Sequence, residues 1–171
     1  RPKQEKKWLR KAQPGCFWIS QKEQNRRTGP VRLTCRLTMT IFIDSGAFVG
    51  VHNKADDNFK MAVEGFSVIE NKGWRVVTTD YVVDEVYTRL ITKTDYRKTM
   101  VFDTFLRTSR MTVERIAPER FIAAQEIFRR YNKDKKWSFT DCTSYVVMKE
   151  LKIKDIFTFD RNFEEMGFKI L

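Results

Sequence analysis

The chain has 171 residues, a formal net charge of +11, three cysteines and one histidine. This length suits one domain that buries its own core without disulfides or a structural metal. The cysteines share no C-x-x-C spacing, which argues against a disulfide framework or a zinc site and indicates free thiols in a reducing compartment. No run approaches the roughly 18 to 20 apolar residues of a membrane span, so we expect a cytoplasmic protein without membrane contact.

The positive charge is concentrated at the start of the chain. Residues 1–38 contain 11 lysines and arginines against two glutamates, a net charge of +9, whereas residues 39–171 contain 22 basic and 20 acidic residues. We therefore predict a basic arm at 1–38, either disordered or a non-native extension, ahead of one domain at 39–171. Such an arm either binds phosphate backbones through counterion release or is a solvated segment without function.

From residue 39 onward, short apolar runs alternate with amphipathic stretches. In chain order we predict a strand at 40–43, a helix that begins at 59 and closes at 72–73, a strand at 75–78, helices at 80–90 and 96–107, a strand at 112–116, helices at 118–131 and 141–151, a strand at 155–159 and a closing strand at 168–171. The polar segment at 50–58, which holds His52, is predicted to be an exposed loop. Strands that alternate with helices indicate an α/β fold with a parallel sheet covered on both faces.

Four acidic residues stand where an apolar segment gives way to a turn or a helix: Asp44, Glu85, Asp141 and Asp160. Asp44 and Asp160 follow predicted strands, and open α/β sheets bind ligands beyond the carboxyl ends of their strands. Ionised carboxylates about 4 Å apart repel by about 4 kcal/mol per pair at an effective dielectric of about 20, so we expect the group either to be held together by a cation or to be partly protonated. Carboxylate oxygens are hard ligands, which favours Mg²⁺ or Mn²⁺.

Three of the four acids, taken alone, also have a structural explanation. Asp44 can form a turn with its own backbone, and Asp141 lies in the first turn of its helix, where the helix dipole favours a carboxylate. Glu85 precedes Arg89 by four residues, which is the spacing of a surface ion pair. The four positions together, rather than any one of them, indicate a metal site.

The four acids are not equally well determined by the sequence. Asn162 and Glu165 already form a capping-box pattern for the short segment that follows, which leaves Asp160 without a capping role. In the predicted helix at 80–90, Asp84 and Glu85 flank the apolar face about equally. Helical periodicity therefore does not choose between them.

Four segments around these acids carry a family resemblance. They read Thr40-Ile-Phe-Ile-Asp44-Ser-Gly-Ala-Phe, Thr79-Asp-Tyr-Val-Val-Asp-Glu85, Phe139-Thr-Asp141-Cys and Thr158-Phe-Asp160-Arg-Asn-Phe. Their order and spacing resemble the acidic motifs of PIN domains, specifically the VapC-type toxin ribonucleases, over about residues 39–171. The resemblance implies a PIN-like three-layer α/β fold, with about five parallel strands between helices. The basic arm departs from this pattern.

By the same resemblance, the four acids are the expected catalytic metal ligands, for one or two Mg²⁺ or Mn²⁺ ions. The resemblance prefers Glu85 to Asp84, which stays a candidate beside the metal. Ser45 and Thr140 occupy positions where such proteins often keep a hydroxyl near the metal. The implied activity is metal-assisted hydrolysis of RNA phosphodiester bonds. A small antitoxin partner and a homodimer are implied as well.

Two other functions are compatible with parts of this sequence. The alternative from a different class is a non-catalytic RNA-binding or partner-binding PIN-like module, although such a module has no use for four acids that repel one another. A haloacid-dehalogenase-type phosphatase would need a second aspartate two residues after Asp44, where this chain has Gly46. The segment Lys133–Trp137 is either a candidate RNA-contact loop or a plain solvated one.

Overall fold

One parallel sheet forms the centre of the domain. The computed structural model describes residues 39–171, and within them the strands are β1 (Thr40–Ile43), β2 (Arg75–Thr79), β3 (Thr112–Glu114), β4 (Asp155–Phe157) and β5 (Lys169–Ile170). They lie in the order β3-β2-β1-β4-β5, and every neighbouring pair is parallel. All carboxyl ends of the strands therefore face one edge of the sheet, as the sequence predicted.

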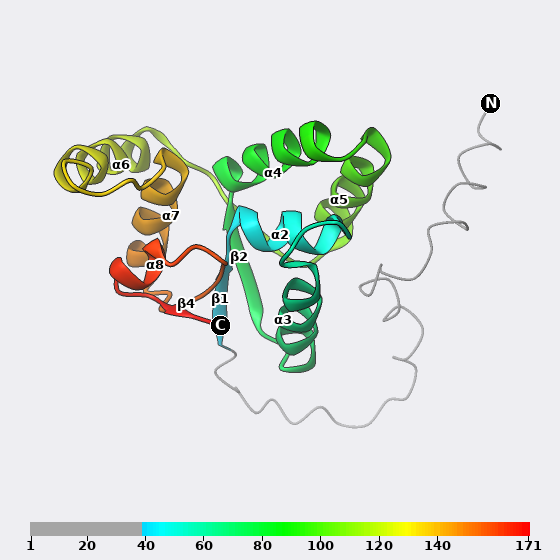
Figure 1. Cartoon of the computed structure of the whole chain (residues 1–171). Coiled ribbons are helices and arrows are strands. Elements are labelled where there is room, and N and C mark those ends of the chain that lie inside the picture. The colour runs from blue at the N-terminus through cyan, green and yellow to red at the C-terminus, as the bar shows by residue number, and fades with distance from the viewer. Residues whose placement is uncertain (1–38) are drawn as a thin grey trace, which may run out of the picture. The chain divides into compact units, whose positions relative to one another are not determined.

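Seven helices of the described residues flank this sheet. They are α2 (Ser45–His52), α3 (Phe59–Asn71), α4 (Asp80–Lys93), α5 (Tyr96–Thr108), α6 (Pro118–Tyr131), α7 (Phe139–Glu150) and α8 (Asn162–Glu165). The chain runs from β1 to β3 along one half of the sheet and then crosses to β4 and β5 beyond β1. Because crossovers between parallel strands are right-handed, the two halves place their helices on opposite faces. Figure 1 shows α2, α3 and α5 on one side of the strands and α6, α7 and α8 on the other.

Aromatic side chains pack α2 tightly into its layer. The ring of Phe48 lies 5.8 Å from that of Phe66 and 5.6 Å from that of Phe102, and Phe66 lies 5.4 Å from Phe157 of β4. A fully buried aromatic side chain contributes roughly 1.5–3 kcal/mol to folding. Since Asp44 caps α2, this packing fixes the position of the acid at the end of β1.

The helix α2 corrects the prediction for this region. No helix was predicted after β1, because α2 is apolar on nearly all sides and lacks the amphipathic pattern of a surface helix. His52 lies in its last turn rather than in an exposed loop. Its Nδ1 is 2.8 Å from the carbonyl oxygen of Phe48, its ring stacks edge-on against Phe102, and burial lowers its pKa. His52 is therefore a packed structural residue.

Several sequence predictions concern residues that the structure does not describe. The basic arm at 1–38 lies outside the described residues, and Cys16 and Cys35 lie there with it. Cys142 is a free, buried thiol, and burial raises its pKa to about 11. No helix within residues 39–171 is long and apolar enough to cross a membrane.

Candidate metal centre

The site forms where the strand order reverses, between β1 and β4. The last residues of these two strands, Ile43 and Phe157, pair in register. The amide of Asp44 continues the ladder by donating to the carbonyl oxygen of Phe157 at 3.1 Å. The residues that follow both strands therefore lie side by side at the carboxyl edge of the sheet, the position where open α/β sheets bind their ligands.

Asp44 is the most central of the four acids. Its side chain is buried, and its Oδ2 accepts hydrogen bonds from the hydroxyl of Thr158 at 3.0 Å and from the amide of Gly46 at 3.4 Å. Burial raises the pKa of Asp44, and the negative charge of Glu85 raises it further, while its hydrogen bonds act in the opposite direction. Asp44 thus feels the charge of an acid that lies 41 positions later in the sequence.

Glu85 reaches the site from α4. Its Oε1 accepts a hydrogen bond from the hydroxyl of Ser45 at 3.0 Å and contacts Nη1 of Arg89 at 3.4 Å. The same guanidinium donates to the hydroxyl of Ser45 at 3.1 Å. Asp84 is exposed on the neighbouring helical position. Of the two adjacent acids, Glu85 is therefore the one that faces the end of β1.

Asp141 enters from α7 and is buried. It forms a capping box: its Oδ2 accepts from the amide of Ser138 at 2.7 Å, and its own amide donates to the Ser138 hydroxyl at 3.0 Å. Burial raises the pKa of Asp141 to about 6, and the charges of Asp44 and then Asp160 add to the rise. Asp141 lies in the first turn of its helix, as predicted, and the capping box with Ser138 is an addition that the sequence analysis did not predict.

Asp160 lies beyond the end of β4, which stops at Phe157 rather than at the predicted residue 159, and its contacts correct a second local prediction. Its carboxylate accepts from the amide of Asn162 at 2.8 Å and from the side-chain amide of Asn162 at 3.2 Å. Asn162 is the first residue of α8, not its cap, and Arg161 before it makes no capping side-chain bond. The predicted capping box from Asn162 is wrong because Asp160 itself makes the local turn.

We call Asp44, Glu85, Asp141 and Asp160 the acidic cluster. Glu85 raises the pKa of Asp44, and both Asp44 and Asp160 raise that of Asp141, so the four are electrostatically linked. Their oxygen donors and shared negative charge fit a hard divalent cation. Within residues 39–171, however, no three Asp, Glu, His or Cys side chains are arranged as a finished metal shell. The fit between the acidic cluster and a cation therefore rests on its oxygen donors and its negative charge. The side chains would have to move to form a complete coordination shell.

The hydroxyls of Thr158 and Thr140 differ from the sequence prediction for the surroundings of the acidic cluster. Thr158, which sequence reasoning missed, bonds to Asp44 and also accepts from the amide of Asp160 at 3.0 Å. Its only sequence signal is a hydroxyl two residues before an acid. Thr140 is half-buried, and in the described part of the chain its hydroxyl makes no hydrogen bond to an acid, although Ser45 bonds to Glu85 as expected.

Only part of the predicted RNA-contact loop before α7 is free to contact RNA. Trp137 is 5% exposed and stacks between Tyr131 and Tyr145, with ring centroids 5.0 and 6.4 Å away. Lys135 forms an ion pair with Glu165 at 2.9 Å. Trp137 is thus a core residue.

Comparison with known proteins decides the family. The model of the PIN domain matches residues 41–169. The chain belongs to the PIN domain family. A relative described as the 23S rRNA-specific endonuclease VapC20 of Mycobacterium tuberculosis is 25% identical over 128 residues, which cover 75% of this chain and 95% of that protein. The VapC-type resemblance found in the sequence is thereby confirmed.

Solved structures agree with this PIN-domain fold. The crystal structure of Mycobacterium tuberculosis VapC20, described as a Sarcin-Ricin loop cleaving toxin, has a TM-score of 0.68, 26% identity, and coverage of 75% of this chain and 95% of that one. VapBC2 from Rickettsia felis bound to a promoter DNA fragment has a TM-score of 0.59 at 14% identity, covering 78% and 98%. FitAcB from Neisseria gonorrhoeae has a TM-score of 0.52 at 13% identity, covering 77% and 96%. The last two bear on the fold alone.

Proposed function

We propose that this PIN-domain protein is a metal-dependent endoribonuclease, in which the acidic cluster holds one or two Mg²⁺ or Mn²⁺ ions and cuts RNA phosphodiester bonds. One observation carries the proposal: Asp44 and Asp141, from two distant elements, are both buried, and burial and then the charge of Asp44 raise the pKa of Asp141 to about 6. Such a pair is costly to fold unless a cation or a proton neutralises it. The VapC20 relative, similar over 95% of its length, is described as an endonuclease.

In this proposal the protein supplies ligands and orientation. A bound divalent cation would make its coordinated water a nucleophile near neutral pH and neutralise charge on the phosphate. Thr158 holds one oxygen of Asp44, and Ser45 holds one oxygen of Glu85. The capping box holds Oδ2 of Asp141. Each of these bonds limits rotation of a carboxylate that would hold the metal.

Two further parts of the proposal concern partners. The protein would act as the toxin of a toxin–antitoxin pair, with a small antitoxin that covers the acidic cluster, and it would work as a cytoplasmic homodimer. The support is that the VapC20 structure is described as a toxin.

The non-catalytic alternative keeps one supporting observation. No three acids of the described residues are arranged as a finished metal shell. A PIN-like module that only binds RNA or a partner would show this same arrangement permanently, whereas a nuclease would complete the shell when metal is added.

A cleavage assay with the full chain separates the two functions. The substrate is an RNA fragment containing the sarcin–ricin loop of 23S rRNA, with Mg²⁺, Mn²⁺ or EDTA. Cleavage that needs metal and falls at least about 100-fold in Glu85→Gln, but not in the matched control Asp84→Asn, supports the nuclease. RNA binding without cleavage under any metal condition supports the binding module, and equal loss in both variants contradicts the assignment of Glu85.

A further inference from the structure

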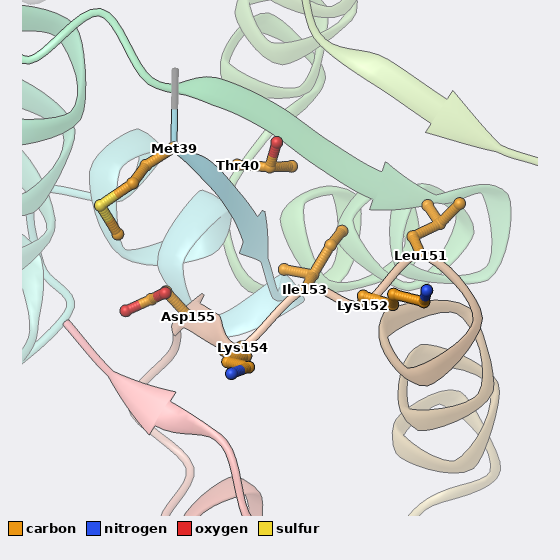
Figure 2. A pocket seen from close by; sticks show the side chains of 7 residues that line it. All are labelled: Met39, Thr40, Leu151, Lys152, Ile153, Lys154 and Asp155. Carbon is orange, nitrogen blue, oxygen red and sulfur yellow. The ribbon is translucent and has the colours of Figure 1, made fainter. Parts of the chain in front are cut away.

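Two adjoining hollows open at the end of the sheet opposite to the acidic cluster. The smaller, of about 240 Å³, is lined by Met39, by Thr40 at the start of β1 and by the segment 151–155, and Figure 2 shows its side chains. The larger, of about 530 Å³, shares residues 152–155 and adds Met148, Lys149 and 167–169. We call the two hollows together the lysine groove. It lies at the amino ends of β1, β4 and β5, whereas the acids follow the carboxyl ends.

The rim of the lysine groove is strongly cationic. Four exposed lysines line it, namely Lys149, Lys152, Lys154 and Lys169, against one acid, Asp155. None of the four lysines forms a salt bridge within residues 39–171, although Arg107, Arg115, Arg120 and Lys135 elsewhere in the domain are paired with acids. Residues 39–171 as a whole are almost neutral, so this positive charge is a local feature that Asp155 offsets only in part.

The floor of the lysine groove is apolar. Met148, Ile153 and Phe168 line it and are buried. The ammonium of Lys149 sits 4.8 Å from the centroid of the Phe168 ring and 5.2 Å from that of Tyr145, so a cation–π contact holds it at the rim. An apolar floor under a cationic rim suits a ligand with flat, weakly polar groups on an anionic chain. Single-stranded RNA has this chemistry, with bases for the floor and a phosphate at each nucleotide for the lysines.

The chain's own basic arm is an unsuitable occupant of the groove. Residues 1–38 join the domain at Met39, which lines the smaller hollow, but they carry a net charge of +9. Like charges disfavour this contact. The occupant that the charges favour is an anion from outside the chain.

We infer that the lysine groove binds the phosphate backbone of single-stranded RNA at a contact site separate from the acidic cluster. The inference concerns binding and does not require the acidic cluster to be catalytic. The two sites stand at opposite ends of strands about 13 Å long, so an RNA that contacts both must extend over several nucleotides. Very short oligonucleotides would reach only one site.

The test is a binding measurement with the full chain in EDTA, which keeps it independent of cleavage. Fluorescence anisotropy follows a labelled 12-nucleotide oligouridylate across a series of salt concentrations. The groove variant combines Lys152→Gln, Lys154→Gln and Lys169→Gln. The matched control combines Lys54→Gln, Lys60→Gln and Lys93→Gln, three exposed lysines outside the groove. Both variants lose the same total charge.

The groove variant is expected to bind about tenfold or more weakly than the wild type, with the slope of log K against log salt lower by about 2, since each phosphate contact on a single strand contributes about 0.7. The control is expected to change affinity by about twofold. Equal losses in both variants overturn the inference, because total charge alone would then explain binding. RNA should also protect Lys152 and Lys154 from amine acetylation in the wild type. If polyglutamate protects these two lysines from acetylation and RNA does not, the inference is also overturned. The groove would then bind an acidic protein segment.

Discussion

The hydroxyl of Thr158 donates a hydrogen bond to Oδ2 of Asp44 at 3.0 Å, across 114 positions of sequence. The same hydroxyl accepts from the amide of Asp160 at 3.0 Å. One threonine after β4 thus joins two members of the acidic cluster from neighbouring strands. It also lowers the pKa of Asp44, against the effect of burial, and so favours the ionised form that a metal needs.

Thr158→Val keeps the shape of this side chain and removes its hydroxyl. Because Thr158 and Asp44 are both buried, the loss is expected to cost about 1–3 kcal/mol of unfolding free energy. Urea unfolding measures this. Thr104→Val removes an exposed helical hydroxyl that bonds to a backbone carbonyl at 2.9 Å and should cost less than about 0.5 kcal/mol. Equal costs for the two variants would show that the contact with Asp44 contributes nothing particular.

The stability of the metal-free protein should fall as the pH rises from about 4 to about 7. Asp141 has an ordinary pKa of 3.8 that burial, with the charges of Asp44 and Asp160, raises to about 6. The folded state therefore binds a proton more tightly than the unfolded state does. The resulting stabilisation is fully present below the unfolded pKa and is lost as the pH rises through about 6, by up to about 3 kcal/mol.

Urea unfolding in EDTA at a series of pH values measures this dependence, and the difference between wild type and Asp141→Asn isolates it. The variant cannot ionise at this position, so its stability should fall less steeply over the same range. Parallel curves for the two proteins would mean that Asp141 does not carry the raised pKa.

The strands and the order of the acids could be predicted because both depend on local sequence. A short apolar run such as Ile41–Ile43, followed by an acid, has few other structural uses in an α/β pattern. Helix starts are local features too: α5 begins at Tyr96, as predicted, whereas α7 begins at Phe139, two residues before the predicted start, because the side chain of Ser138 caps it. These features need no knowledge of distant residues.

The rest depends on contacts between segments far apart in the chain. The choice of Glu85 over Asp84 follows from Ser45, which lies 40 positions earlier, and helical periodicity does not contain that contact. The helix α2 was not predicted because the core surrounds it. A surface helix is recognised in a sequence by its single polar face, which α2 lacks. The role of Thr158 depends on the pairing of β1 with β4. Metal binding was inferred from charge and resemblance and stays a prediction.

Gly65 permits the close approach of α3 to β4. A Cβ at this position would overlap Cζ of Phe157 and lie 2.6 Å from Cε2 and 2.8 Å from Cε1 of the same ring. Gly65→Ala should therefore destabilise the domain by about 1–3 kcal/mol through overpacking, although alanine favours helices elsewhere. Thermal unfolding is the measurement. Glu64→Ala, at an exposed position of the same helix, is the control and should change the stability little. If Gly65→Ala also leaves the stability unchanged, the ring of Phe157 moves aside freely.

Arg89 places a positive charge beside the acidic cluster. Its Nη1 lies 3.4 Å from Oε1 of Glu85, and the side chain is 32% exposed. A cation at this point competes with a metal ion for Glu85, so Arg89→Gln is expected to tighten Mn²⁺ binding several-fold in a calorimetric titration. Arg107→Gln, which breaks a pair of the same spacing with Asp103 on α5, should leave it unchanged. Weaker Mn²⁺ binding in Arg89→Gln would instead mean that Arg89 chiefly holds Glu85 in place.

Divalent metal should stabilise the folded domain through the acidic cluster. A ligand that binds only the folded state adds about 2.7 kcal/mol at a hundredfold excess over its Kd, so Mn²⁺ is expected to raise the Tm and EDTA to reverse the rise. The effect should grow from pH 5 to pH 7, because metal ligation needs the ionised form of Asp141, whose pKa is about 6. Asp141→Asn should lose most of the Mn²⁺ stabilisation, and Asp84→Asn, at an exposed position beside Glu85, should retain it. An equal rise of the Tm in both variants would place the bound metal elsewhere on the protein.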